Sequence, residues 1–229
     1  MKTCIVLIVS LCFAASAFAQ EKEDERLKNS YTVLKEILAA PDKGIPKDLL
    51  NKSECVIVYP SVLKAAFVVG GSYGRGVITC RKGVSHNGPW SAPAMFALEG
   101  GSFGFQIGGE ATDFVLLVMN DSGANSVLSS KVKLGADASA AAGPVGRSTS
   151  AETDIVMKAE ILSYSRARGI FAGVSLEGST MRSDGDANKH VYGKEYSAKE
   201  IVQEGKVKTT AAGLPLVNLL NRVTPRHAK

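Results

Sequence analysis

The side chains that could do chemistry in this sequence do not complete a catalytic pattern. Ser175 lies in Gly173-Val-Ser-Leu-Glu177, which begins like the nucleophile elbow of a hydrolase but lacks the closing glycine of that turn. A hydrolytic serine also needs a base, and no histidine is spaced to suggest one. The histidines are His86, His190 and His227. We therefore predict no catalytic residues and a protein that is not an enzyme.

Metal and phosphate motifs are incomplete as well. The segment 184–195 alternates acidic and amide residues as a calcium loop does, but Lys189 stands at its sixth position, where that loop requires glycine. A turn that caps a helix is the simpler interpretation. Gly74-Arg-Gly76 lacks the third glycine of a dinucleotide-binding fingerprint, and Gly143-Pro-Val-Gly-Arg147 lacks the spacing and the lysine of a P-loop. We expect neither a metal nor a cofactor.

A modest excess of basic residues is the strongest indication of a ligand. The chain carries a formal net charge of +5 at pH 7, and the excess lies after residue 54. Such residues can bind phosphates or anionic lipid headgroups, or they can form a dispersed solvated surface. Nucleic acid is not expected, because no basic run is interleaved with aromatic residues. The candidate lipid-binding residues are Arg75, Arg81, Lys82, Lys131, Lys133, Arg147, Arg166 and Arg168.

Residues 1–19 have the features of a secretory leader. Lys2 is followed by the apolar run Ile5–Phe13, which is too short to span a bilayer, and then by Ala17-Phe-Ala19, a pattern that signal peptidase accepts. We predict a cleavable signal peptide and an exported protein, periplasmic or extracellular. Two alternatives stay open: an uncleaved membrane anchor, and a lipid attached to Cys12.

Removal of the leader leaves two cysteines, Cys55 and Cys80, each in a predicted strand. In an oxidising compartment such a pair can form a disulfide between strands. The alternative is two buried free thiols, and the sequence does not decide between them.

The order of the predicted elements indicates an α+β protein. A stripe of apolar residues at helical spacing predicts a helix from Lys22 to Ala40. Further helices are expected at 46–50, 121–129, 197–204 and 214–222. Strands are expected at 55–59, 66–71, 76–80, 94–98, 102–108, 112–119, 131–142, 161–164 and 170–177. The chain is thus divided into an N-terminal helical segment (20–44), a central domain (45–204) and a C-terminal helix and tail (205–229).

The predicted strands are rich in glycine, and one glycine motif recurs. Gly70-Gly-Ser-Tyr-Gly74 is echoed by Gly100-Gly-Ser-Phe-Gly104. We interpret the echo as paired bends, because glycine permits sharp coiling and close approach of strands. Pro60 is expected to end the first strand, Ser72–Arg75 to join the next two, and Asp121 to cap a helix. The resulting sheet is expected to be strongly curved and mainly antiparallel, barrel-like or a sandwich, with helices at both ends of the chain.

Several segments of the body, taken together, resemble the SYLF domain family, and they occur in that family's order. They are Phe67-Val-Val-Gly-Gly71, Gly74-Arg-Gly76, Trp90-Ser-Ala-Pro-Ala94, Gly100-Gly-Ser-Phe-Gly-Phe-Gln-Ile-Gly108, Thr112-Asp-Phe-Val-Leu-Leu-Val-Met-Asn120, Leu134-Gly-Ala-Asp-Ala-Ser139, Ala142-Gly-Pro-Val-Gly-Arg147, Ser163-Tyr-Ser-Arg166, Gly169-Ile-Phe-Ala-Gly-Val-Ser-Leu-Glu-Gly178, Asp186-Ala-Asn188 and Tyr192-Gly193. The resemblance covers about Ile45 to Glu204.

The resemblance implies a lipid-binding module without catalytic residues. Eukaryotic members bind phosphoinositides and, in fungal forms, actin; neither partner is expected for an exported bacterial-type member. The family's amphipathic N-terminal helix corresponds here to the Lys22–Ala40 helix, whose acidic start would repel an anionic membrane. We therefore predict a module that binds anionic or phosphorylated lipid headgroups through its body. The alternative is an envelope scaffold that binds a protein partner and has no lipid role.

Overall fold

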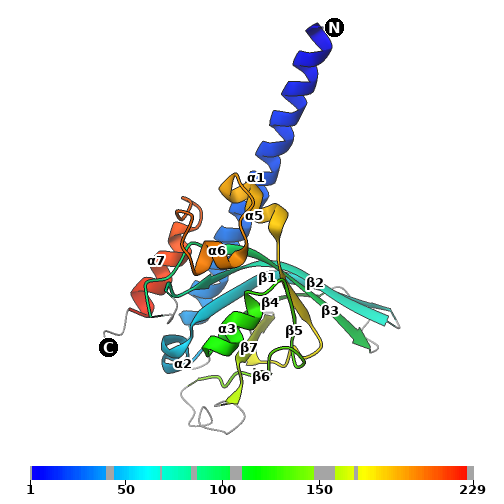
Figure 1. Ribbon diagram of the computed structural model, residues 1–229. Helices are drawn as coiled ribbons and strands as arrows, with labels where there is room; N and C mark the ends of the chain where they lie inside the picture. The colour runs from blue at the N-terminus through cyan, green and yellow to red at the C-terminus, as the bar shows by residue number, and fades with distance from the viewer. Residues whose placement is uncertain are drawn as a thin grey trace.

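The computed structural model describes residues 2–39, 44–67, 69–83, 87–103, 110–146, 158–167 and 170–225, with the backbone alone at 2–19, 64–67, 69–70, 101–103 and 110. The helices are α1 (Lys2–Leu38), α2 (Lys47–Lys52), α3 (Asp121–Val127), α5 (Gly185–Tyr192), α6 (Ala198–Val202) and α7 (Leu214–Val223). The strands are β1 (Cys55–Phe67), β2 (Val69–Cys80), β3 (Ala94–Phe103), β4 (Glu110–Val118), β5 (Lys131–Lys133), β6 (Ala140–Ala142), β7 (Ile161–Ala167), β8 (Ile170–Gly173) and β9 (Thr180–Ser183). This order confirms the α+β class (Figure 1).

The strands form one sheet in the order β5-β9-β3-β2-β1-β4-β7-β6, with β8 paired to β7. Every pair of strands is antiparallel except β6–β7, which is parallel. Figure 1 shows that the sheet is strongly curved, like half of a barrel, and that the start of α1 projects from the body. The prediction of a curved, mainly antiparallel sheet flanked by terminal helices is confirmed.

Helices bury both faces of the middle of the sheet. On β1, Val56 and Val58 belong to the core that α1, α2 and α7 complete, whereas Ile57 and Tyr59 belong to the core on the other face, with α3 and α6. All four side chains are at most 1% exposed. Because neither face meets water, this part of β1 consists of a continuous apolar run instead of alternating polar and apolar residues.

Cys55 and Cys80 lie directly opposite each other on β1 and β2, and a disulfide joins them. Both residues are fully buried. Of the two states that the sequence left open, the structure therefore has the bridged one.

The hairpin of β1 and β2 differs from the prediction at two points. Pro60 does not end the first strand, because a β-bulge between Tyr59 and Val62 accommodates it and β1 continues to Phe67. Ser61 in this bulge has a positive φ of 52°, and its N–H donates to Asp113 Oδ1 at 2.9 Å. Proline has no backbone N–H to donate to a neighbouring strand, so a bulge is one of the few positions that it can occupy inside a sheet. The predicted break at 72–75 is also wrong, since β2 runs unbroken through it.

Three further predictions need correction. The expected strand at 131–142 is two short strands, separated by a turn in which Gly135 has a φ of 84°. The strand β9 was not predicted, because its four residues, Thr180–Ser183, show no alternation long enough to detect. The N-cap of α3 is Asn120 and not Asp121: its side chain accepts the N–H of Gly123 at 2.8 Å.

The glycine echo has a simple structural origin. Its two copies pair with each other across β2 and β3, with Gly71 opposite Gly101 and Ser72 opposite Gly100. Further along β2, a Cβ on Gly76 would lie 2.1 Å from the Val58 carbonyl oxygen of β1. The close approach between strands that we predicted is therefore found at Gly76, whereas the first copy of the echo is not a bend, because β2 runs through it without a break.

Replacing Gly76 by alanine is expected to lower the free energy of unfolding by about 2 kcal/mol, because the new methyl group overlaps backbone that cannot move freely. Gly185→Ala is the matched control: a Cβ there meets nothing within 4 Å, at the first residue of α5. Urea unfolding of both variants checks this. Equal stability of the two variants would contradict the close-approach role of Gly76.

Candidate functional site: a basic face of the sheet

Two of the predicted lipid-binding residues have structural roles instead of forming an exposed basic surface. Arg81 is only 5% exposed; its guanidinium stacks over the Trp90 ring at 4.8 Å and donates to the Thr224 carbonyl at 3.3 Å. Burial lowers its pKa. Arg166 donates twice to Asp113 Oδ2, at 2.9 and 2.7 Å, and also pairs with Glu36 of α1. These arginines hold helices and strands together.

Other candidates are isolated or cannot be placed. Lys82 is half-buried just after β2, beside Arg81. Arg147 and Arg168 lie outside the described residues. Three candidates remain, and the sheet brings them together.

The remaining three, Arg75, Lys131 and Lys133, lie on one face of the sheet with a fourth cation that sequence reasoning missed. Lys131 is opposite Arg182, Arg182 is opposite Ala97, and Ala97 is opposite Arg75. Residues directly opposite one another in antiparallel strands share a face. At strand spacings of 4.7–4.9 Å, the row from Lys131 to Arg75 spans about 14 Å. We call Lys131, Lys133, Arg182 and Arg75 the basic face.

The next row of the same face ends in apolar residues. Lys133 is opposite Thr180, Thr180 opposite Glu99, Glu99 opposite Tyr73, and Tyr73 opposite Leu63. Leu63 is 62% exposed and Tyr73 is 46% exposed. Cations and exposed apolar side chains therefore lie side by side on one surface.

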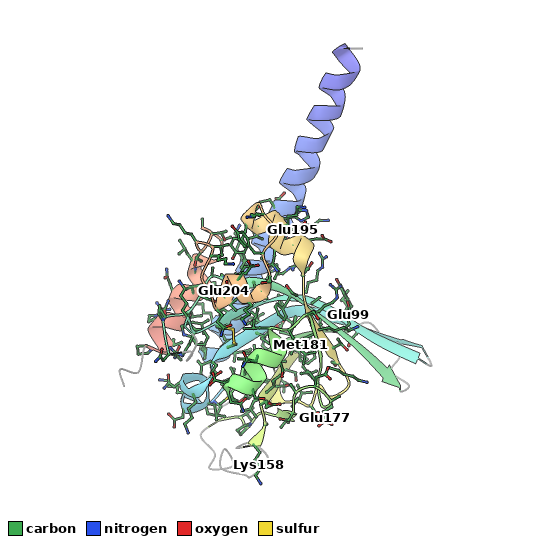
Figure 2. All side chains as sticks on the ribbon, viewed as in Figure 1. Glu99, Lys158, Glu177, Met181, Glu195 and Glu204 are labelled. Carbon is green, nitrogen blue, oxygen red and sulfur yellow. A yellow bond between two sulfur atoms is a disulfide. The ribbon has the colours of Figure 1, made fainter. Side chains whose placement is uncertain are left out.

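Two of the four cations of the basic face, Arg182 and Arg75, form ion pairs within the protein. Arg182 Nε pairs with Glu99 Oε1 at 2.9 Å, and Figure 2 shows Glu99 on β3 near the projecting ends of β1 and β2. Arg75 Nε lies 3.5 Å from Asp184 Oδ2 and donates to the Tyr73 hydroxyl at 3.1 Å. Lys131 and Lys133 are exposed, and no carboxylate pairs with them in the part of the chain that the structure describes.

A buried charge cluster fixes the position of Arg75. Arg26 of α1 pairs with Glu23 at 2.7 Å and with Asp184 at 3.2 Å, and Asp184 in turn pairs with Arg75. Glu23, Arg26 and Asp184 are each at most 7% exposed. Burial raises the pKa of Glu23, and Arg26 lowers it in part. The cluster ties α1 and the start of α5 to the end of the basic face.

The Asp/Asn motif is a structural clamp and not a calcium loop. Asp184 caps α5, as the simpler interpretation predicted. Asn188, fully buried, accepts the Met95 N–H at 2.7 Å, and the Tyr192 hydroxyl donates to the Pro93 carbonyl at 2.5 Å. The helix thereby holds the start of β3, the strand that lies between Arg182 and Arg75.

The described residues offer little else that could bind or react. Among them, no group of three histidine, cysteine or acidic side chains is placed to hold a metal ion. Gly143, in the segment tested as a P-loop, packs instead on Tyr164, whose ring would meet a Cβ at 2.1 Å. Where side chains are described, which in α1 begins at Gln20, no helix is long and apolar enough to cross a membrane.

Comparison with known proteins gives consistent matches. The family model Ysc84, described as "Las17-binding protein actin regulator", matches residues 99–223. Protein YSC84 of Saccharomyces cerevisiae is 34% identical over 88% of this chain and 42% of its own length. LAS seventeen-binding protein 3 of the same yeast is 33% identical (88% and 43%), and SH3 domain-containing YSC84-like protein 1 of Mus musculus is 32% identical (82% and 54%). The chain spans about half the length of the curated relatives it matches.

Proposed function

Because the chain belongs to the Ysc84 (SYLF) family, we propose that it is an exported, non-enzymatic module that binds membranes through anionic or phosphorylated lipid headgroups. The observation that carries this proposal is the register that aligns Lys131, Arg182 and Arg75 in one row. A row of cations spread over several strands suits a surface of phosphates better than a single small ligand, which would need an enclosed pocket.

The charges on this face favour a reversible association. A lysine or arginine near an anionic membrane contributes about 1 kcal/mol. Lys131 and Lys133 can contribute fully, whereas Arg182 and Arg75 must share their charge with Glu99 and Asp184. Lipids have to compete with these internal carboxylates, so the electrostatic part of the affinity is moderate and decreases with salt.

Vesicle flotation tests the proposal. The protein without residues 1–19 is expected to float with phosphatidylglycerol vesicles at low salt and to remain in solution with phosphatidylcholine vesicles. Absence of flotation with either lipid would overturn the proposal.

Replacing Glu99 by glutamine is expected to strengthen binding to phosphatidylglycerol vesicles about fivefold, because it frees Arg182 to pair with headgroups. The pair is about 40% exposed on both sides, so its loss is expected to leave the free energy of unfolding nearly unchanged. Titration of vesicles into the two proteins measures the change. Weaker binding of Glu99→Gln would show that Glu99 does not compete with lipid.

The export part of the proposal rests on the leader and on α1. Directly after the leader, α1 carries three acidic residues, Glu21, Glu23 and Asp24. Acidic residues stabilise the N-terminus of a helix, so α1 is well suited to begin near Gln20.

Deleting residues 1–19 is accordingly expected to change the free energy of unfolding by less than about 0.5 kcal/mol. Protein secreted from the full gene is expected to have an intact mass that begins at Gln20. A secreted or membrane-held product that retains residues 1–19 would contradict the cleavable leader.

Protein binding is the second candidate function, since the family model is described as "Las17-binding protein actin regulator" and one relative is named LAS seventeen-binding protein 3. The basic face would then meet an acidic protein surface. Affinity capture from an envelope extract separates the two functions. Recovery of one stoichiometric protein without lipid would favour the scaffold, and recovery of phospholipid would favour membrane binding.

A further inference from the structure

The basic face borders an apolar strip, formed by Leu63, Tyr73 and Ala111. Membrane association by charge alone does not explain why apolar side chains are exposed there. We infer that this strip enters the interfacial region of the bilayer to which the basic face binds. The inference rests on the proposed function and names the part of the same surface that meets lipid below the headgroups.

The strip lies where the helical cover of the sheet ends. On the same face, Val58 and Val77 are at most 1% exposed in the core beneath the helices. Beyond the bulge that follows Val58, Leu63 is 62% exposed and its opposite partner Tyr73 is 46% exposed. Ala111, opposite Leu63 on β4, is exposed too.

The surroundings of the strip favour a bilayer over other occupants. Tyr73 lies opposite Glu99 in the row that begins at Lys133, and its hydroxyl accepts from Arg75, which belongs to the basic face. Tyrosine is typical of the membrane interface, because its ring is apolar and its hydroxyl can remain hydrated. Cations beside it match the phosphates that lie just above the acyl chains.

The backbone extends this pairing away from the body. The register of β1 and β2 continues with Ala65 opposite Gly71 and Phe67 opposite Val69, and none of these positions holds a charged residue. Figure 1 shows the paired ends of β1 and β2 projecting from the body, beyond the helices.

Tryptophan at position 63 provides a depth probe. Leu63→Trp is mixed with phosphatidylglycerol vesicles whose acyl chains carry bromine, a contact quencher of tryptophan. The native Trp90 is 2% exposed in the core and supplies a constant background. Lys199→Trp is the matched control, because Lys199 is exposed on α6, which packs on the opposite face of the sheet.

We expect the Leu63→Trp emission to shift to shorter wavelength and to be quenched, while that of Lys199→Trp is unchanged. Vesicle binding without quenching at position 63 would overturn the inference and leave the proposed function intact. Failure of the unsubstituted protein to bind vesicles would overturn both. A dimer in sedimentation that Leu63→Ser dissociates would assign the strip to a second copy of the chain.

Salt gives an independent readout. Apolar insertion is not screened by ions, so the unsubstituted protein should retain measurable binding at 0.5 M salt, a roughly threefold higher ionic strength than the physiological one. Leu63→Ser combined with Tyr73→Ser is expected to lower that residual affinity at least tenfold, with an unchanged urea midpoint because both side chains are exposed. An equal residual affinity of the two proteins would overturn the inference.

Discussion

Replacing Lys131 and Lys133 together by glutamate is expected to weaken binding to phosphatidylglycerol vesicles at least a hundredfold at low salt. Each lysine near an anionic membrane contributes about 1 kcal/mol, and reversing its charge adds repulsion, so the loss is on the order of 3 kcal/mol or more. Both side chains are exposed, on either side of the buried Val132. The fold should therefore tolerate the change, and vesicle titration measures it.

Lys47→Glu with Lys52→Glu is the matched control, because these lysines are exposed too but lie on α2, away from the basic face. It alters the net charge by the same amount. A loss specific to the first pair would locate binding at the basic face. An equal loss from both pairs would mean that only the net charge matters, which contradicts a defined surface.

Removing the Cys55–Cys80 disulfide is expected to lower the free energy of unfolding by about 3–4 kcal/mol. The two cysteines are separated by 25 residues, and closing a loop of this length restricts the unfolded chain by that amount. The substitution Cys55→Ala with Cys80→Ala tests this in urea unfolding. Since both residues are fully buried, the unsubstituted protein in reductant is the necessary comparison.

Both the double variant and the reduced protein should unfold at similarly lowered urea concentrations. If the free energy of unfolding of either protein differed by less than 1 kcal/mol from that of the oxidised protein, the disulfide would not be needed for the fold. The expected effect also has a consequence for expression: the protein should accumulate as folded material only where the bond can form.

Much of the fold followed from local patterns in the sequence. The stripe of apolar residues in α1 and the proline before α2 each act within a few residues, and the structure has both helices. Ser197 and Glu200 form the full capping box of α6, close to where the sequence placed that helix. Such signals depend on neighbours along the chain, so they can be read without the fold.

The basic face could not be predicted in the same way, because its members come from β5, β9 and β2. Their alignment depends on register between strands that are far apart in the chain. Arg182 was missed with the short strand that carries it. Arg81 was taken as a surface cation because Trp90 meets it only across a β-bridge, and Thr224 only when α7 packs onto the sheet. Charge alone does not separate a structural arginine from a binding one.

Equilibrium binding of the protein without residues 1–19 to vesicles of increasing phosphatidylglycerol content tests the membrane proposal most directly. The affinity is expected to rise steeply with the anionic fraction and to fall when salt is added. The apolar contribution of Leu63 and Tyr73 to the affinity is expected to fall less with salt than the electrostatic contribution. Binding that is absent at every composition in low salt, or that is equal for phosphatidylglycerol and phosphatidylcholine, would contradict it.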